Sequence, residues 1–250
     1  PLEQWNVSNV TTMERMFFAA SSFDQSLEQW DVANVTTMGQ MFYEASSFNQ
    51  PLDQWNVSKV TNMIATFYIA SAFNGNIGSW NTSLVTDMRF MFAGASTFNQ
   101  PLGGWNVSNV TNMEYMFSSA SSFNQPLEQW NVANVTNMEG MLSDTSVFNQ
   151  PLGGWNVGNV TNMEAMFYQA SIFNQDISNW TGSAATTASA NMFFGADSFQ
   201  NNFNCDNSIT GPVNSCVDVT APTMTITSST TGVTDGSTTN DSPIQLTFTS

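Results

Sequence analysis

Positive charge is almost absent from this 250-residue sequence. Three residues are Lys or Arg and none is His, so that 19 Asp and Glu residues leave a net charge of −16. Because contacts to phosphate need Lys and Arg, we expect no nucleic-acid partner, and an anionic membrane surface would repel the chain. Nucleophile–base pairs that use an imidazole are excluded as well.

Cysteines and long apolar runs are scarce too. No run approaches the ~20 apolar residues of a membrane-spanning helix, so we expect no membrane insertion.

The two cysteines, Cys205 and Cys216, flank a short loop that contains Gly211 and Pro212. Two thiols without His are too few for a typical zinc site. We therefore expect a disulfide and an oxidising compartment, with two reduced thiols as the alternative.

No residue pattern predicts an enzyme or a resident cofactor. Carboxylates that lie two residues before some Trp residues are replaced by Gly at the equivalent positions elsewhere, and no Gly-rich phosphate loop is present. Ca²⁺ is the one cofactor left open. Asp218, Asp235 and Asp241 offer oxygen ligands for it, although their spacing matches no defined calcium loop.

What the sequence does contain is a repeat of 25 residues. Apolar residues make up 41% of the chain, too many for a disordered protein. The Trp residues recur at this spacing as Trp5, Trp30, Trp55, Trp80, Trp105, Trp130, Trp155 and Trp180. Such a period indicates a solenoid, propeller or array, whose units bury their apolar side chains against each other. We interpret the Trp residues as a core ladder, which is favoured over sugar-stacking platforms because they alternate with Val.

Each repeat divides into two halves. Leu2, Trp5 and Val7 have leucine-rich-repeat spacing and predict a short strand, with Trp5 and Val7 inside and Asn6 outside. The pattern M-x-x-M-F-x-x-A over residues 13–20 places apolar residues at i, i+3, i+4 and i+7, which predicts a short helix. Thr or Asn residues just before it are suitable caps. The predicted fold class is therefore a leucine-rich-repeat-like solenoid with a short strand and a short helix per 25-residue turn.

The repeat unit W-[ND]-V-[SA]-N-V-T-[NT]-M-x-x-M-F-x-x-A-S-x-F-N-Q-P-L resembles the BspA-like family of surface-protein repeats, also called the DUF285 repeat. The resemblance covers about residues 1–203. It implies a leucine-rich-repeat-like solenoid on secreted or cell-surface proteins, often adhesive, without shared catalytic residues. Lys59 and Leu84 depart from the pattern by replacing an Asn, and the last copy is degenerate.

Three segments are expected along the chain. Residues 1–203 form the solenoid of seven repeats plus a degenerate capping repeat, and residues 204–219 form a cap or hinge closed by the cysteines. Residues 220–250 are rich in Ser and Thr, and "TMTITS" and "IQLTFTS" alternate as strands do. This last segment resembles the first strands of a bacterial Ig-like domain, a partial β-sandwich that is incomplete because such a sandwich needs about seven strands.

Asn-x-Ser/Thr sequons are dense, which makes covalent glycans an expected modification. The candidate N-glycosylation sites are Asn6, Asn56, Asn81, Asn106, Asn179 and Asn240. A second set is expected to point inward and satisfy backbone groups: Asn9, Asn34, Asn109, Asn134 and Asn159. The alternative is that the turns of the repeat require Asn, Ser and Thr in any case.

The motif "FNQ" adds one further column of polar side chains. Its Asn residues are Asn49, Asn99, Asn124, Asn149 and Asn174. Stacked once per repeat, these amides can form a hydrogen-bonded ladder along the solenoid. A polar strip that binds a ligand is the alternative.

The sequence therefore predicts an extracellular or cell-surface structural or adhesive protein and no enzyme. We expect a subunit or excerpt of a surface fibre or filament, self-associating head to tail, with strand donation into the incomplete sandwich as a possible mechanism. The alternative is a cell-surface binding module, an adhesin that recognises a protein or glycan through the strand face of the solenoid.

Overall fold

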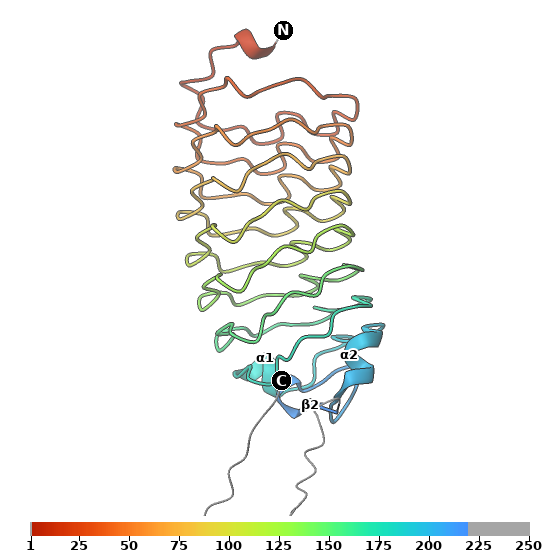
Figure 1. Ribbon diagram of the computed structural model, residues 1–250. Coiled ribbons are helices and arrows are strands. Elements are labelled where there is room, and N and C mark those ends of the chain that lie inside the picture. Colours follow the sequence, from red (N-terminus) through yellow and green to blue (C-terminus); the bar gives the residue numbers. More distant parts are fainter. Residues whose placement is uncertain (1, 220–250) are drawn as a thin grey trace, which may run out of the picture. The chain divides into compact units, whose positions relative to one another are not determined.

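In the computed structural model, which describes residues 2–219, successive 25-residue segments stack one on the next (Figure 1). We call these segments rungs: rung 1 is residues 2–25, rung 2 is residues 26–50, and so on to rung 7, residues 151–175. The described residues belong to one compact unit. The expected Ig-like strands and Asn240 thus lie outside the described residues.

The segment predicted as a helix is instead a run of tight turns. In rung 1, the N–H of Met16 donates to the carbonyl of Met13 (3.2 Å), and the N–H of Ala20 donates to that of Phe17 (3.1 Å). Arg15 and Ala19 have φ values of 58° and 54°, in the left-handed region, which no α-helix contains. The equivalent residues of the later rungs are also left-handed. The helix prediction is therefore wrong for residues 13–20.

This backbone frees alternate N–H groups to join the rungs. In rung 1 the donor and acceptor pairs are Met13 with Thr37, Arg15 with Gly39, Phe17 with Met41, and Ala19 with Tyr43, at 2.7–3.1 Å. A helix would have used these N–H groups within itself. The predicted strand is not formed either, because residues 2–10 close two turns. β pairing between rungs is confined to one isolated parallel bridge per step, in the column that runs from Thr12 and Thr37 to Asn162.

The core consists of columns of equivalent side chains inside the rungs. One column is Phe23, Phe48, Phe73, Phe98, Phe123, Phe148, Phe173 and Phe199, with neighbouring ring centroids 5.7–6.3 Å apart. Seven Trp residues, from Trp30 to Trp180, are 0–4% exposed. Each of their indole N–H groups donates to the carbonyl of the Leu or Ile 28 residues earlier, at 2.9–3.1 Å. Packing and hydrogen bonding therefore fix the same register between rungs.

Short regular elements are found mainly at the C-terminal end of the stack (Figure 1). They are α1 (Ser183–Thr186), α2 (Asp197–Asn202), β1 (Phe203–Asn204), the 3-10 helix η2 (Val213–Ser215) and β2 (Val217–Asp218), while η1 is Leu2–Gln4. β1 and β2 pair antiparallel, with Phe203 opposite Asp218. The expected disulfide between Cys205 and Cys216 is confirmed. Among the described residues, no helix is long and apolar enough to cross a membrane.

Candidate interaction surfaces

Rung 1 presents an open backbone edge. In rungs 2 to 7, the carbonyls equivalent to those of Thr12, Glu14, Met16 and Phe18 accept hydrogen bonds from the preceding rung. Within residues 2–219, these four carbonyls of rung 1 accept none. The stretch from Thr12 to Phe18 therefore offers acceptors without donors to anything that lies on it. We call it the acceptor edge.

Apolar side chains accompany the acceptor edge. Trp5 is 56% exposed, Phe18 43% and Met16 37%. Trp5, expected in the core ladder, is thus exposed among the described residues, because no described rung covers its outer face as rung 1 covers Trp30. The other end of the stack differs, since the loop closed by the disulfide lies across it. There the N–H of Phe193 donates to the carbonyl of Ile209 (2.8 Å).

Five of the candidate glycosylation residues lie at the surface. Asn6, Asn56, Asn81, Asn106 and Asn179 are all exposed. In the first four, the side-chain oxygen accepts a hydrogen bond from the N–H two residues later, at 3.0–3.2 Å. The Nδ2 atoms, to which a glycan would attach, make no hydrogen bond among the described residues, so a glycan there would break none.

The second set of sequon residues does not point inward as expected. Asn9, Asn34, Asn109, Asn134 and Asn159 are all exposed. Except for Asn9, each of these amides reaches along the surface and donates to a backbone carbonyl of the preceding rung, at 2.7–2.8 Å. They therefore satisfy backbone groups from outside the core, where a polar amide loses less hydration.

The Asn residues of the FNQ motif form a ladder along the stack. The side-chain oxygen of each accepts the N–H of the next Asn, from Asn49 to Asn74 and onward to Asn149 and Asn174, at 2.8–3.0 Å. Gln100, Gln125, Gln150 and Gln175 donate to the same oxygens. The ladder begins at Asp24, whose carboxylate accepts hydrogen bonds from the backbone N–H of Asn49 and from the side-chain amide of Gln50. It ends at Asn174, whose buried side-chain oxygen has no partner within the described chain.

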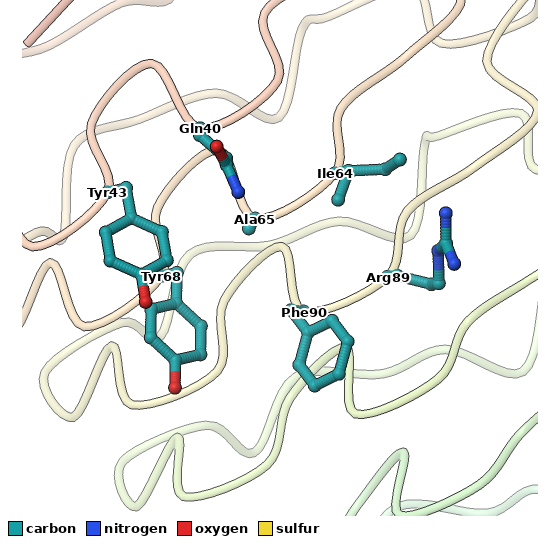
Figure 2. Close-up of a pocket in the computed structure, with 7 residues that line it drawn as sticks. All are labelled: Gln40, Tyr43, Ile64, Ala65, Tyr68, Arg89 and Phe90. Carbon is teal, nitrogen blue, oxygen red and sulfur yellow. The ribbon is translucent and has the colours of Figure 1, made fainter. Parts of the chain in front are cut away.

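A column of aromatic side chains on the outside of the stack escaped the sequence analysis. Phe18, Tyr43 and Tyr68 lie at equivalent positions in rungs 1 to 3, with ring centroids 4.6 and 4.5 Å apart. A recess of about 400 Å³ opens beside Tyr43 and Tyr68 (Figure 2). Gln40, Ile64, Ala65, Arg89 and Phe90 complete its lining. The sequence signal was available, because large aromatic residues recur directly after a buried Phe at a position that must face outward.

Further down the same face, Tyr115 and Glu139 form a hydrogen-bonded pair. The Tyr115 hydroxyl donates to Glu139 Oε1 at 2.9 Å. Burial, reinforced by this bond, raises the pKa of Tyr115 to about 12. The ring lies over Gly140, where a Cβ would be 2.1 Å from it. The phenol is therefore neutral at ordinary pH and serves as a donor.

No cluster of three metal-ligating side chains is present in residues 2–219. Of the carboxylates considered for Ca²⁺, Asp218 lies in β2, and Asp235 and Asp241 lie outside the described residues. The one described ion pair joins Arg89 and Asp87 (3.0 Å). The surfaces that remain as candidates for function are thus the acceptor edge, the exposed sequons and the aromatic recess.

Comparison with known proteins gives one match. A family model described as "Mycoplasma protein of unknown function, DUF285" matches residues 1–103, 51–147 and 91–207, which together span all seven rungs. The three overlapping matches are what a tandem repeat produces when a model contains several units. No curated protein and no solved structure matches the chain.

Proposed function

This chain belongs to the DUF285 family, for which no function is described, and from that premise we propose a role based on its surfaces. The protein is a BspA-like, extracellular structural or adhesive repeat protein whose solenoid forms a segment of a surface fibre or filament. The disulfide supports an oxidising, extracellular location. The exposed sequons support decoration with N-linked glycans where the host has the machinery.

The repeated pairing of one rung with the next is the observation that supports this proposal, and the acceptor edge presents the same carbonyls for a further pairing. If the edges of two copies met face to face, carbonyl would oppose carbonyl over Thr12–Phe18, and no hydrogen bond would form. The edge therefore favours a donor segment from a different part of another copy. Such a heterologous contact builds a filament when the rotation from one copy to the next does not close a ring. Strand donation from one copy into the incomplete sandwich expected of residues 220–250 of the next is a second contact of this kind.

Analytical ultracentrifugation of the 250-residue chain over a range of concentrations tests this role. We expect mass to increase with concentration, because the edge carries exposed apolar side chains beside its unpaired carbonyls. Trp5→Glu places a charge on the same open face of rung 1 as the acceptor edge and should leave a monomer. Leu84→Glu is the matched control, since Leu84 is 48% exposed and lies in rung 4, away from the edge. A wild-type chain that stays monomeric at high concentration would overturn the proposal.

A second role, that of a surface binding module or adhesin, is favoured by the aromatic recess. Solenoids commonly bind ligands along one face. Here the recess combines three aromatic rings with polar side chains, a composition typical of small-molecule and glycan sites. The two roles are compatible, because the recess lies in rungs 2 to 4 and the acceptor edge in rung 1.

A further inference from the structure

The recess at Ala65 results from one small side chain between two large ones. Gln40, Ala65 and Phe90 occupy equivalent positions in rungs 2, 3 and 4, and Figure 2 shows Ala65 with these neighbours on either side. Ala65 is 4% exposed and forms part of the floor.

The same position offers an internal comparison in rung 6. There Gly140 is also small, but the ring of Tyr115 from the preceding rung fills the space above it. At Ala65 the preceding rung contributes the narrower side chain of Gln40, which lines the recess and is held by a hydrogen bond from Arg15 Nε to its side-chain oxygen. Ala65 thus forms the floor of an open recess in rung 3, whereas Gly140 lies under an aromatic ring.

The walls of the recess are aromatic, and its rim is polar. Tyr43 and Tyr68 stack at 4.5 Å, and Phe90 meets Tyr68 edge to face at 6.3 Å with an interplanar angle of 76°. Gln40 contributes an amide whose nitrogen makes no hydrogen bond among the described residues. An occupant must therefore combine an apolar face with groups that can accept and donate hydrogen bonds.

Charge favours a neutral occupant. Arg89 is the one cation in the lining, and its guanidinium is held by Asp87 through Nε at 3.1 Å and Nη2 at 3.0 Å. Its charge is therefore compensated, and the net charge of −16 on the chain opposes the approach of anions.

We propose that this recess binds one or two pyranose rings of a neutral oligosaccharide. A pyranose has a face of C–H groups that packs on aromatic rings and a rim of hydroxyls that pairs with amide and phenol groups. A volume of about 400 Å³ lies within the range of small-molecule sites. This site gives a ligand class to the binding-module role proposed above, on which it rests, and does not depend on the fibre role.

Isothermal titration calorimetry with cellotetraose, maltotetraose, laminaritetraose and chitotetraose tests the proposal, with tetragalacturonate as the acidic comparison. Ala65→Gln is the blocking variant. It copies Gln40, which has φ 57° where Ala65 has φ 51°, so the backbone accepts it. We expect binding of at least one neutral tetrasaccharide, weakened at least about tenfold in Ala65→Gln and in Tyr68→Ala. Tyr168→Ala is the control, because Tyr168 stacks on Phe194 outside the recess. This variant should bind the tetrasaccharide as the wild type does.

Three results would overturn the proposal. These are no heat from any neutral tetrasaccharide at about 10 mM, equal affinity in wild type and Ala65→Gln, or a preference for tetragalacturonate. Circular dichroism establishes that each variant is folded, and Ala65→Phe, which copies Phe90, replaces Ala65→Gln if the latter unfolds. Trp5→Glu should bind sugar normally, so a failure of assembly and a failure of sugar binding are distinguishable.

Discussion

The indole N–H of Trp105 donates a 3.1 Å hydrogen bond to the backbone carbonyl of Ile77 in the rung before. Trp105→Phe removes this donor and leaves the carbonyl unpaired in the core, together with a small cavity. We expect the free energy of unfolding to fall by about 2–4 kcal/mol in urea titrations followed by circular dichroism. Trp5→Phe is the control, with an expected loss below about 1 kcal/mol because Trp5 is largely exposed. Equal losses would contradict the role given to this bond.

The Asn ladder predicts different effects for the same substitution at two positions. Asn99 Oδ1 accepts bonds from the Asn124 N–H and from Gln125 Nε2, both at 3.0 Å. Asn99→Ala should therefore cost about 1–3 kcal/mol of unfolding free energy. Asn174→Ala should cost almost nothing, because the oxygen that it removes has no partner in the described chain. Urea midpoints measure both, and a larger loss at Asn174 would show that the ladder does not stabilise the stack.

Asn99→Asp provides a conservative test of the same ladder. Asp24 already accepts the two equivalent bonds from rung 2, each at 2.9 Å. We therefore expect Asn99→Asp to keep most of the stability that Asn99→Ala loses at neutral pH. A loss as large as that of Asn99→Ala would indicate that the amide nitrogen, and not the oxygen, is required.

At the left-handed positions of the repeat, we expect Ala165→Gly and Gly140→Ala to change the stability of the fold in opposite directions. Ala165 has φ 53°, so Ala165→Gly should relieve backbone strain and stabilise the fold by up to about 1 kcal/mol. Gly140→Ala should instead destabilise it by about 2 kcal/mol or more, because the new Cβ displaces the Tyr115 ring and its bond to Glu139. Thermal melts of both variants check the signs. A stabilised Gly140→Ala would contradict the position of the Tyr115 ring.

The pair of Tyr115 and Glu139 predicts a pH dependence at alkaline pH. The folded pKa of Tyr115, about 12, exceeds the value of about 10 for an unfolded chain, so the folded state holds this proton more tightly. Its contribution to stability is complete below pH 10 and is lost as the pH rises to 12. In Glu139→Gln we expect the phenol to ionise at lower pH, as measured by ultraviolet absorbance at 295 nm. An unchanged titration would show that Glu139 does not influence the phenol.

Which side chains are buried could be predicted from the sequence. Equivalent positions recur every 25 residues, and residues such as Trp105 and Val107 must pack on their counterparts whatever the local backbone does. Trp5 shows the limit of this reasoning. Its sequence context is close to that of Trp105, and the residues from Trp5 to Val10 repeat those from Trp105 to Val110, but its burial depends on a neighbour that the repeat pattern does not specify.

The backbone of residues 13–20 could not be predicted in the same way. Apolar residues at i, i+3, i+4 and i+7 suit a helix, and they suit a run of turns that buries the same side chains equally well. The distinguishing signal is the presence of Gly94, Gly140 and Gly195 at the two left-handed positions of the repeat. The recess was beyond prediction, because it depends on how the side chains of Gln40, Ile64 and Phe90 lie around Ala65.

The uniform contacts between rungs also bear on how such a chain can change length. Each step of the stack repeats the same backbone pairs, the same indole bond and the same amide bond. An in-frame duplication or deletion of 25 residues therefore joins surfaces that already match, and no new side chain is needed at the junction. Recombination between near-identical copies can thus lengthen or shorten the protein by whole rungs while the contacts between rungs are kept. Related genes can in this way encode stacks of different length that share the same rung structure.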